Sequence, residues 1–284
     1  MKMIVSINSG ADPRRILEKA DGILIGTAYS LLEKRNENEI RELASLAHEM
    51  HKKIYLATDD VIHERELANF ETFINEINDM VDGYVIGDLG ALMLLKNKGK
   101  ELFFDAGTLL SNSLDATFFR LNGAHPIAAR ELTIEEIVKM SEENKGDISL
   151  FLIGRIVQAV SNRYYLSAYF EKTGIDKDPK AKKYFIKEEN RNELMPIVES
   201  ERGSRILTGE IVLALKELAM LKDRINSLFI NGDTLNNDLL YDLVDVVSDL
   251  DATNAAISET RIQQRYPNEI FGHGYLYKKT NITR

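Results

Sequence analysis

Short apolar or β-branched runs recur along this chain, and each one ends in a polar or glycine-bearing turn. There are eight such runs, at 3–7, 22–26, 53–57, 83–87, 101–105, 126–130, 148–153 and 226–230. Continuous apolar runs of this length are typical of strands in a parallel sheet that is covered on both faces. The pattern therefore predicts eight buried strands.

Between most of these runs, apolar residues recur with the 3.6-residue period of a helix. The segment 40–50 has one apolar face, formed by Ile40, Leu43, Ala47 and Met50. The segment 239–250 has a similar face. Thr133 precedes Glu136 by three residues, which is the spacing of a capping box, so a helix is predicted to begin there.

This alternation of strands and helices predicts an α/β fold, a (β/α)8 TIM-like barrel with an insertion after strand seven. An open doubly wound sheet is disfavoured, because the first strand is followed by INSGAD rather than by a glycine-rich dinucleotide-binding turn. We predict a barrel over residues 1–254, with the insertion 155–209 at its mouth, and a C-terminal tail over 255–284.

Composition narrows the class of protein. The chain has 284 residues, 44% hydrophobic and 29% charged, which is an ordinary globular mixture. No apolar run approaches the ~18–20 residues of a membrane helix, and the start does not resemble a secretory signal. The absence of cysteine excludes disulfides, thiolate nucleophiles and iron–sulfur ligation. A cytoplasmic protein without a membrane partner is expected.

Charge is distributed unevenly along the chain. The net charge is −9, but residues 154–191 carry nine basic and five acidic residues, a local charge of +4, so the remainder carries −13. Aromatic residues are interleaved with these cations, and this combination can bind RNA through phosphates and stacked bases. The predicted RNA-binding residues are Tyr164, Lys172, Lys180, Lys182 and Lys183. The alternative is that the aromatic rings close the open end of the barrel.

Polar residues follow several predicted strands, where the active sites of such barrels lie. Arg130 could bind an anionic ligand that Glu131 orients, or the two could form an ion pair that fixes the rim. The predicted substrate-binding residues are Arg130, Glu131, Arg155, Arg163, Asp88 and Asn112. The charged stretch 199–209 contains Gly203 and predicts a tight turn, such as a hairpin over the mouth.

Metal and nucleophile chemistry find little support in the sequence. His48 and His51 have helical spacing for a metal, but no acidic third ligand is close to them in the sequence. No motif typical of a serine hydrolase, zinc peptidase or nucleotide-binding loop is present. We predict no metal site and no cofactor.

Five segments resemble peptidase family U32, the collagenase-like proteins. They are AARELTIEEI at 128–137, FLIGRIVQAVSNRYYLS at 151–167, ESERGSRI at 199–206, SLFING at 227–232 and DAGTLLSNS at 105–113. The tail FGHGYLYKK is similar to the end of the tRNA-hydroxylation (protein P) branch. The resemblance implies a TIM-like barrel and either protease activity or hydroxylation without molecular oxygen, on tRNA wobble uridine, ribosomal RNA or quinone precursors. It also implies a four-cysteine iron–sulfur cluster in many members, and paired subunits in some.

This chain departs from the family pattern at the positions that matter most for that chemistry. Two family cysteines fall on Val157 and Tyr164, and the family's HG after strand seven reads Ile153–Gly154. The family's KIEGR in the last strand reads FINGD at 229–233. The residues retained by motif are Arg130, Glu131, Gly154, Ser161, Arg163 and Gly203.

The sequence is consistent with three functions. The first is a cluster-free member of the tRNA-hydroxylation branch that binds tRNA, or a cysteine-bearing paralogue, rather than performing the redox step alone. The second is a peptidase of collagenase-like type. The third is a barrel lyase for a small anionic metabolite, with Arg130 and either Arg155 or Arg163 as the anion site.

Overall fold

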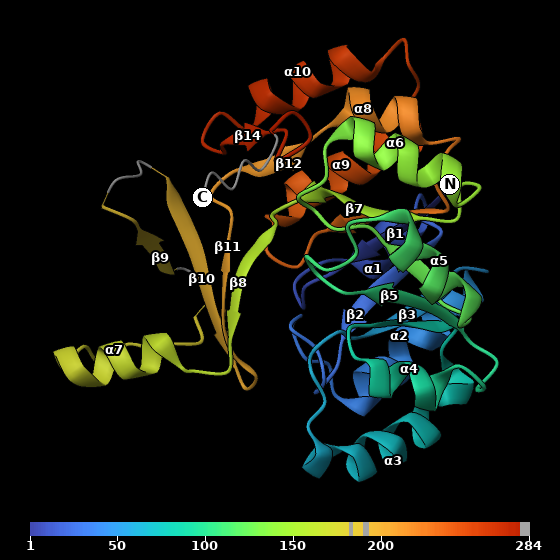
Figure 1. Ribbon diagram of the computed structural model, residues 1–284. Helices are drawn as coiled ribbons and strands as arrows, with labels where there is room; N and C mark the ends of the chain where they lie inside the picture. The colour runs from blue at the N-terminus through green and yellow to red at the C-terminus, as the bar shows by residue number, and fades with distance from the viewer. Residues whose placement is uncertain (182–183, 190–192, 279–284) are drawn as a thin grey trace.

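Eight parallel strands close into a barrel in the computed structural model, which describes residues 1–181, 184–189 and 193–278 (Figure 1). The strand order is β13-β1-β2-β3-β4-β5-β6-β7, and β7 pairs in parallel with β13 to complete the ring. The strands are β1 Lys2–Ser6, β2 Gly22–Gly26, β3 Lys53–Thr58, β4 Gly83–Ile86, β5 Glu101–Asp105, β6 His125–Ile127, β7 Ser149–Gly154 and β13 Ser227–Asn231. The predicted (β/α)8 barrel is confirmed.

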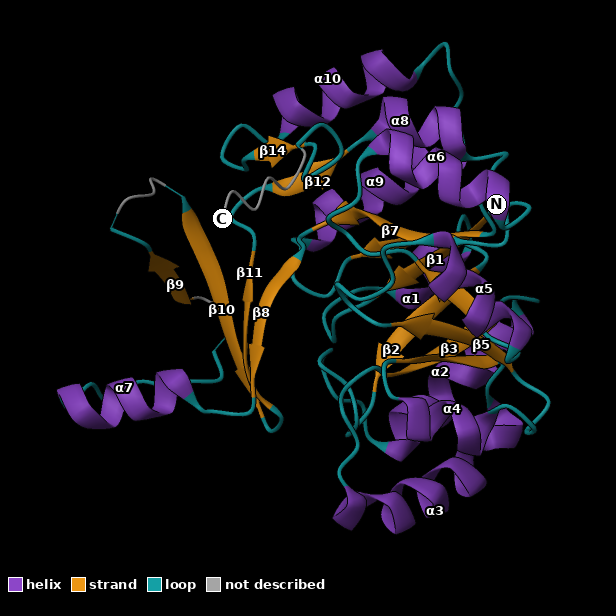
Figure 2. Ribbon diagram, in the orientation of Figure 1, coloured by secondary structure: helices purple, strands orange, loops and turns teal. Residues whose placement is uncertain are grey.

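Helices follow the strands and surround the ring (Figure 2). They are α1 Pro13–Leu17, α2 Glu37–Glu49, α3 Leu67–Ile77, α4 Leu89–Leu95, α5 Ser113–Leu121, α6 Ile134–Glu143, α8 Leu215–Leu221 and α9 Asn237–Ser248, with short turns η1 Glu64–Glu66 and η2 Asn78–Met80 around α3. The helix α10, Ala255–Arg265, comes after the last barrel helix. In the part of the chain that the structure describes, every helix is too short or too polar to cross a bilayer.

The strands are buried on both faces, as their continuous apolar sequences predict. The inner cluster takes residues from every strand of the barrel: Ile4, Leu24, Tyr55, Ala57, Val85, Phe103, Ile127 and Phe229, with Phe151 packed against it. Phe103 and Phe229 meet edge to face with ring centroids 5.1 Å apart. The interior is therefore a filled core rather than a channel.

Two local predictions have different outcomes. The capping box at the start of α6 is present, because Thr133 accepts from the backbone of Glu136 and the Glu136 carboxylate accepts from Thr133 N at 2.8 Å. The predicted strand 126–130 is wrong at its end, since β6 stops at Ile127. Ala129 N donates to the carbonyl of Leu110 in the preceding loop, which takes the chain out of the sheet ladder.

The insertion forms a second, antiparallel sheet beside the barrel (Figures 1 and 2). Its strand order is β8-β11-β10-β9, with β8 Val157–Ser161, α7 Tyr165–Thr173, β9 Tyr184–Lys187, β10 Leu194–Ser200 and β11 Gly203–Leu207. The tight turn predicted around Gly203 joins β10 to β11, with Ser200 opposite Gly203. Gly203 has φ +108° and its α-carbon faces the Ser161 carbonyl, so only glycine fits there.

The helix α7 is capped by a distant strand rather than by its own sequence. No side chain caps it locally. Instead the Glu199 carboxylate of β10 accepts from Leu166 N at 2.8 Å and from Ser167 N at 3.2 Å. Leu166, Phe170 and Ile197 form a small core that is separate from the barrel core. The insertion therefore has a hydrophobic core of its own.

After the insertion the chain returns to the barrel rim. β12, Ile211–Leu213, pairs antiparallel with the end of β7, and β14, Phe271–Gly272, extends this edge. The tail that follows β14 covers the start of α6, where Ile134 N donates to the Leu276 carbonyl at 3.0 Å. The first backbone donor of α6 is satisfied in this way.

We expect Phe103→Ala to lower the free energy of unfolding by about 3–5 kcal/mol, because it leaves a cavity where three strands contribute aromatic rings. Phe185→Ala is the matched control, because that ring is 56% exposed on β9, and its cost should stay within about 1 kcal/mol. Chemical denaturation measures both. Equal losses would contradict the assignment of Phe103 to the core.

Candidate functional site

A cavity of about 470 Å³ lies at the mouth of the barrel, where the carboxyl ends of the strands face the insertion. Its walls include the ends of β3 and β5, the loop after β6 and the strand β8. Its polar and charged lining residues are Asp59, Asp105, Thr108, Arg130, Glu131, Gln158, Arg205 and Asn231. Leu24, Val85 and Phe151 contribute apolar side chains. Ligands bind at this face in barrels of this type.

Arg130 and Asp105 form a two-pronged ion pair at the centre of the mouth. Arg130 Nη1 and Nη2 donate to the two carboxylate oxygens of Asp105 at 2.5 and 2.6 Å. The guanidinium also lies 4.6 Å from the centre of the Phe151 ring. Burial disfavours the charged form of Asp105, but the Arg130 charge outweighs it and holds the pKa of Asp105 below its usual value. Both charges are therefore fixed in place.

Glu131 is not the partner of Arg130. It lines the same cavity, and its Oε2 atom is shielded from solvent without a hydrogen-bond partner among the described residues. The rim is thus fixed by an ion pair, as one of the two interpretations of this motif expects, but the acid comes from β5. The sequence suggested Glu131 as the acid because it is next to Arg130 in the chain. The pairing of β5 with β6 instead places Asp105 opposite Ile127, the last residue of β6, close to Arg130.

Asp59 is a second carboxyl group in the mouth. Its pKa is raised, whereas the pKa of Asp105 is lowered. Burial raises the pKa of Asp59, and the nearby charge of Asp105 raises it further, although hydrogen bonds from Ser30 and Leu31 oppose the shift. Two acids in one cavity with pKa values moved apart are typical of proton-transfer sites. The arrangement can hold a proton on Asp59 beside the fixed Arg130–Asp105 pair.

Two arginines attach the insertion to the barrel. Arg205 of β11 pairs with Asp233 after β13, and both side chains are almost fully buried. Arg202 of the hairpin pairs with Asp60 and Glu66, and its Nη2 donates to the Val61 carbonyl at 2.9 Å. These contacts hold the β10–β11 hairpin over the mouth.

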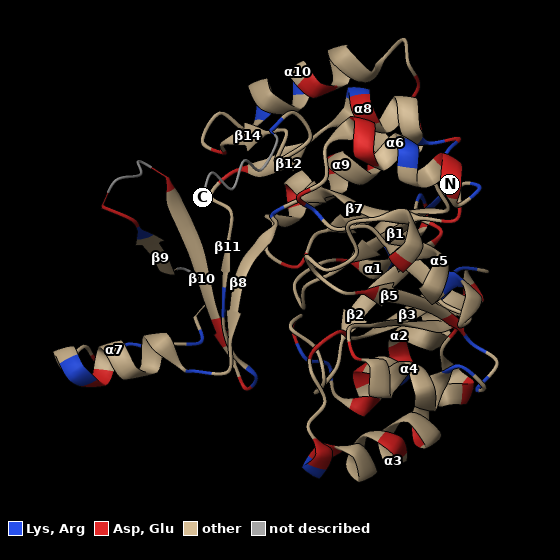
Figure 3. Cartoon of the chain, in the orientation of Figure 1, with Lys and Arg blue, Asp and Glu red and all other residues tan. Residues whose placement is uncertain are grey.

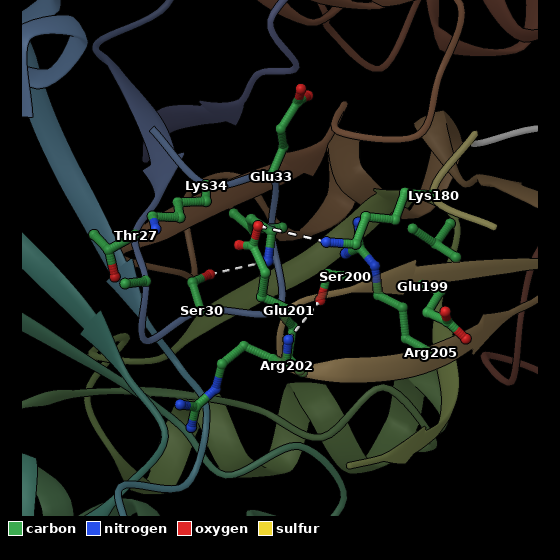
Figure 4. Close-up of a pocket in the computed structure, with 14 residues that line it drawn as sticks. Thr27, Ser30, Glu33, Lys34, Lys180, Glu199, Ser200, Glu201, Arg202 and Arg205 are labelled. Carbon is green, nitrogen blue, oxygen red and sulfur yellow. Dashed lines mark hydrogen bonds and ion pairs between the residues drawn. The ribbon is translucent and has the colours of Figure 1, made fainter. Parts of the chain in front are cut away.

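A smaller cavity of about 260 Å³ lies between this hairpin and the loop after β2 (Figure 4). Arg205 lines both cavities, so the two are adjacent. Lys180 reaches toward Glu201 at 3.6 Å, and Ser30, Glu33 and Lys34 come from the opposite side. Arg205 is absent from the predicted site residues, although it lies in the ESERGSRI segment that resembles the family.

The predicted anion site is not assembled. Arg155 donates to the Thr208 carbonyl at 3.1 Å and to Glu269 at 2.9 Å, and it lines a different cavity from Arg130. Burial lowers the pKa of Arg155, although Glu269 opposes the shift. Arg163 is exposed, and its backbone atoms hydrogen-bond to Ser161 and Ser204. Arg130, Arg155 and Arg163 therefore do not converge on one anion site.

Asp88 and Asn112 cap helices. Asp88 accepts from Ala91 N at 3.0 Å at the start of α4. Asn112 accepts from Leu114 N and Asp115 N, both at 3.0 Å, at the start of α5. Neither lines the mouth cavity. Their position after a strand reflects the need of the next helix for an N-cap.

Of the predicted RNA-binding residues, Tyr164, Lys172 and Lys180 belong to the insertion and do not line the mouth cavity; Figure 3 colours the basic residues of the chain blue. Tyr164 is half exposed, and its hydroxyl donates to the Glu201 carbonyl at 3.0 Å. Lys172 is exposed in the last turn of α7, and Lys180 faces Glu201. Lys182 and Lys183 lie outside the described residues. Phe151 is the only aromatic residue among the described ones that line the mouth, so the insertion's rings do not close it.

The histidine pair does not form a metal site. His48 Nε2 lies 3.0 Å from Asp82, and His51 is an exposed residue just beyond α2. Across residues 1–181, 184–189 and 193–278, no group of three or more histidine, aspartate or glutamate side chains is arranged to hold a metal ion.

Comparison with known proteins identifies the family. The profile of peptidase family U32 matches residues 14–281. The chain belongs to peptidase family U32. The U32 chain is 28% identical over 210 residues to an uncharacterized protease of Methanocaldococcus jannaschii, a match that covers 70% of this chain and 51% of that protein. It therefore spans about half the length of that relative.

Two further proteins are similar to this chain, one in sequence and one in fold. The U32 chain is 26% identical over 237 residues to tRNA hydroxylation protein P2 of Bacillus subtilis, covering 80% of this chain and 74% of that one. The solved structure of the U32 peptidase Mk0906 superposes with a TM-score of 0.50 at 15% identity, over 82% of this chain and 92% of that chain. The second similarity concerns the fold alone.

An iron–sulfur cluster, which the resemblance implies for many family members, does not fit this U32 chain. The sequence contains no cysteine to supply thiolate ligands. At the two positions expected to carry cysteine, Val157 begins β8 opposite Leu207, and the Tyr164 hydroxyl is hydrogen-bonded to the hairpin. A thiolate-ligated cluster therefore cannot be held at these positions.

We expect Asp59→Asn to raise the melting temperature at neutral pH. Because the pKa of Asp59 is raised on folding, its contribution to stability is full below the unfolded pKa and is lost as pH rises through the folded pKa. The advantage of the variant should therefore shrink as pH falls toward the usual pKa of aspartate. Melting curves across this pH range measure the effect.

The adjacent residue provides the control. Asp60→Asn removes a charged partner of Arg202 and should lower stability at neutral pH by about 1–3 kcal/mol. A loss of stability in Asp59→Asn like that of the control would show that Asp59 is ionised and well paired.

Proposed function

We propose that this protein supports the oxygen-independent hydroxylation of tRNA, as a cluster-free subunit that binds RNA. The observation that carries the proposal is the similarity to tRNA hydroxylation protein P2 along 80% of the chain, combined with a sequence that contains no cysteine. The redox step would then come from another U32 protein that carries the cysteines. This chain would supply the RNA surface and a polar mouth.

The charge of the insertion favours RNA as the ligand of this surface. The segment 154–191 is positive in a protein of net charge −9, so cations are concentrated where the chain leaves the barrel. Arg155 is paired with Glu269 of the C-terminal tail, but Arg163 and Lys172 are exposed. Tyr169 and Phe185 are each 56% exposed, and such rings can stack on unpaired bases.

The mouth adds a site of suitable size for a base or a small co-substrate. A cavity of about 470 Å³ with apolar walls and a few convergent polar groups is typical of small-ligand sites. The Arg130–Asp105 pair can orient a ligand through its remaining hydrogen-bonding capacity, and Asp59 can exchange a proton with it. In this proposal the base or co-substrate binds in the mouth, while the insertion holds the rest of the RNA.

The other two functions find less support in the geometry. Among the described residues that line the mouth, Thr108 is the only one with a hydroxyl or thiol, and no histidine lines the cavity to act as its base, so a nucleophilic peptidase site has no observation in its favour. An anionic metabolite would meet Arg130 already neutralised by Asp105, and Arg205 neutralised by Asp233. We therefore put neither function forward.

Deleting the gene in its native host should lower 5-hydroxyuridine and the nucleosides made from it in tRNA. The physical reason is that the cysteine-bearing protein loses its RNA-binding partner. Mass spectrometry of digested tRNA measures the change, and expression of the intact gene should restore it. Unchanged nucleosides in a host without a second protein of this branch would contradict the proposal.

We expect Lys172→Glu combined with Lys180→Glu to weaken tRNA binding. The slope of log affinity against log salt should also become shallower, by about 0.7–0.9 for each phosphate that the variant no longer neutralises. Fluorescence anisotropy with labelled tRNA measures both quantities. Lys139→Glu combined with Lys19→Glu is the matched control, since it changes the net charge by the same amount at two exposed lysines outside the insertion. An equal effect of the control would mean that net charge alone, rather than the insertion, attracts the RNA.

A further inference from the structure

The outer surface of α4 and α5 is unlike that of the other long barrel helices. In α5 the exposed residues are Leu114, Phe118 and Leu121, and in α4 they are Leu89, Gly90 and Met93. None of these six is charged. By contrast, the exposed residues of α2 are all charged or polar: Glu37, Asn38, Arg41, Glu42, Ser45, His48 and Glu49.

Large apolar residues are strongly exposed on this surface. The apolar face consists of Leu89, Met93, Leu109, Leu114, Phe118 and Leu121, with exposed fractions from 54% for Phe118 to 82% for Leu114. The helices that carry most of it follow neighbouring strands, β4 and β5, and lie on the same side of the barrel (Figure 1). On α8 and α10, by contrast, the exposed large apolar residues Met220 and Ile257 stand singly.

The apolar area is close to what one side of a protein dimer needs. Burying one large apolar side chain completely removes roughly 60–120 Å² from water. Because these six side chains are 54–82% exposed, this face offers roughly 250–500 Å². A standard interface buries about 800 Å² per partner, a little over half of it apolar. Together with its polar surroundings, this face can form the core of a small but stable interface.

The spacing of the stripe on α5 favours a second copy of this chain as the partner. Leu114 lies four residues before Phe118, and Leu121 lies three residues after it, so all three share one helical face. When two such helices cross antiparallel about a two-fold axis, Leu114 of one copy meets Leu121 of the other. Phe118 of both copies then lies near the axis. An apolar pattern that reads similarly in both directions suits an isologous interface.

We propose that the apolar face of α4 and α5 joins two copies of this chain in a two-fold dimer. Leu109 belongs both to this face and to the lining of the mouth cavity, so the second copy stands beside the mouth. This dimer is independent of the function proposed above, because it depends only on the outer helices and not on RNA or on a cysteine-bearing protein.

The mass of the purified full-length chain in solution tests the proposal. Sedimentation equilibrium should give twice the 32.2 kDa of one chain, with dissociation on dilution. Phe118→Glu should weaken the dimer by about 100-fold or more, because two carboxylates would be buried at the axis. Ile257→Glu introduces the same charge at an exposed residue of α10 and should leave the dimer unchanged.

The lack of cysteine allows a second test of the geometry. Phe118→Cys should form a disulfide-linked dimer on mild oxidation, because the two positions lie near the axis, while Ile257→Cys should not. A wild-type chain that stays monomeric at every concentration overturns the proposal, as does a Phe118→Glu variant that still dimerises. A face that binds only a different U32 protein, with the chain alone monomeric, overturns it too.

Discussion

The pairing of β7 with β13 is the interaction on which this molecule depends. It closes the ring of strands, and it must form across an insertion that separates the two strands in the sequence. The closure also explains Gly154. This residue has φ +113°, and any side chain there would collide with the Asn231 backbone of the neighbouring strand. The chain can therefore leave the barrel for the insertion directly after Gly154 without disturbing the closing ladder.

Once the barrel is closed, its mouth is shaped by pairs of opposite charges. Arg130 with Asp105 lies within the barrel rim, while Arg205 with Asp233 and Arg202 with Asp60 join the insertion to it. Buried or half-buried charges remain ionised only when they are paired. These pairs use Arg130, Arg202 and Arg205 for structure, whereas Arg163 and Lys172, farther out on the insertion, are exposed.

Membership in peptidase family U32 then separates scaffold from chemistry. The retained residues Arg130, Gly154 and Gly203 each have a structural reason: an ion pair, the strand closure and a hairpin turn. Two of the positions that differ from the family pattern, Val157 and Tyr164, lie on the insertion, where they keep a strand and a hairpin contact. A barrel of this kind keeps its fold while its chemistry changes, because the two depend on different residues.

The strand–helix alternation, the eight strands and the capping box at Thr133 were determined by the sequence itself. Each depends on a local pattern: continuous apolar runs, the 3.6-residue period, or a spacing of three residues. The prediction of Arg130 as a mouth residue also came from a local cue, its place after a strand, and it lines the cavity. The same cue failed to distinguish ligand-binding residues from helix caps at Asp88 and Asn112.

Which side chains pair with one another was decided only by the tertiary structure. Asp105 rather than Glu131 pairs with Arg130, Glu199 caps α7 from more than thirty residues away, and Arg205 reaches Asp233 across the mouth. The shifted pKa of Asp59 likewise requires burial that no sequence pattern reveals. Local propensities depend on neighbours in the chain, whereas ion pairs, tertiary caps and desolvation depend on distances that exist only after the barrel has closed and the insertion has docked.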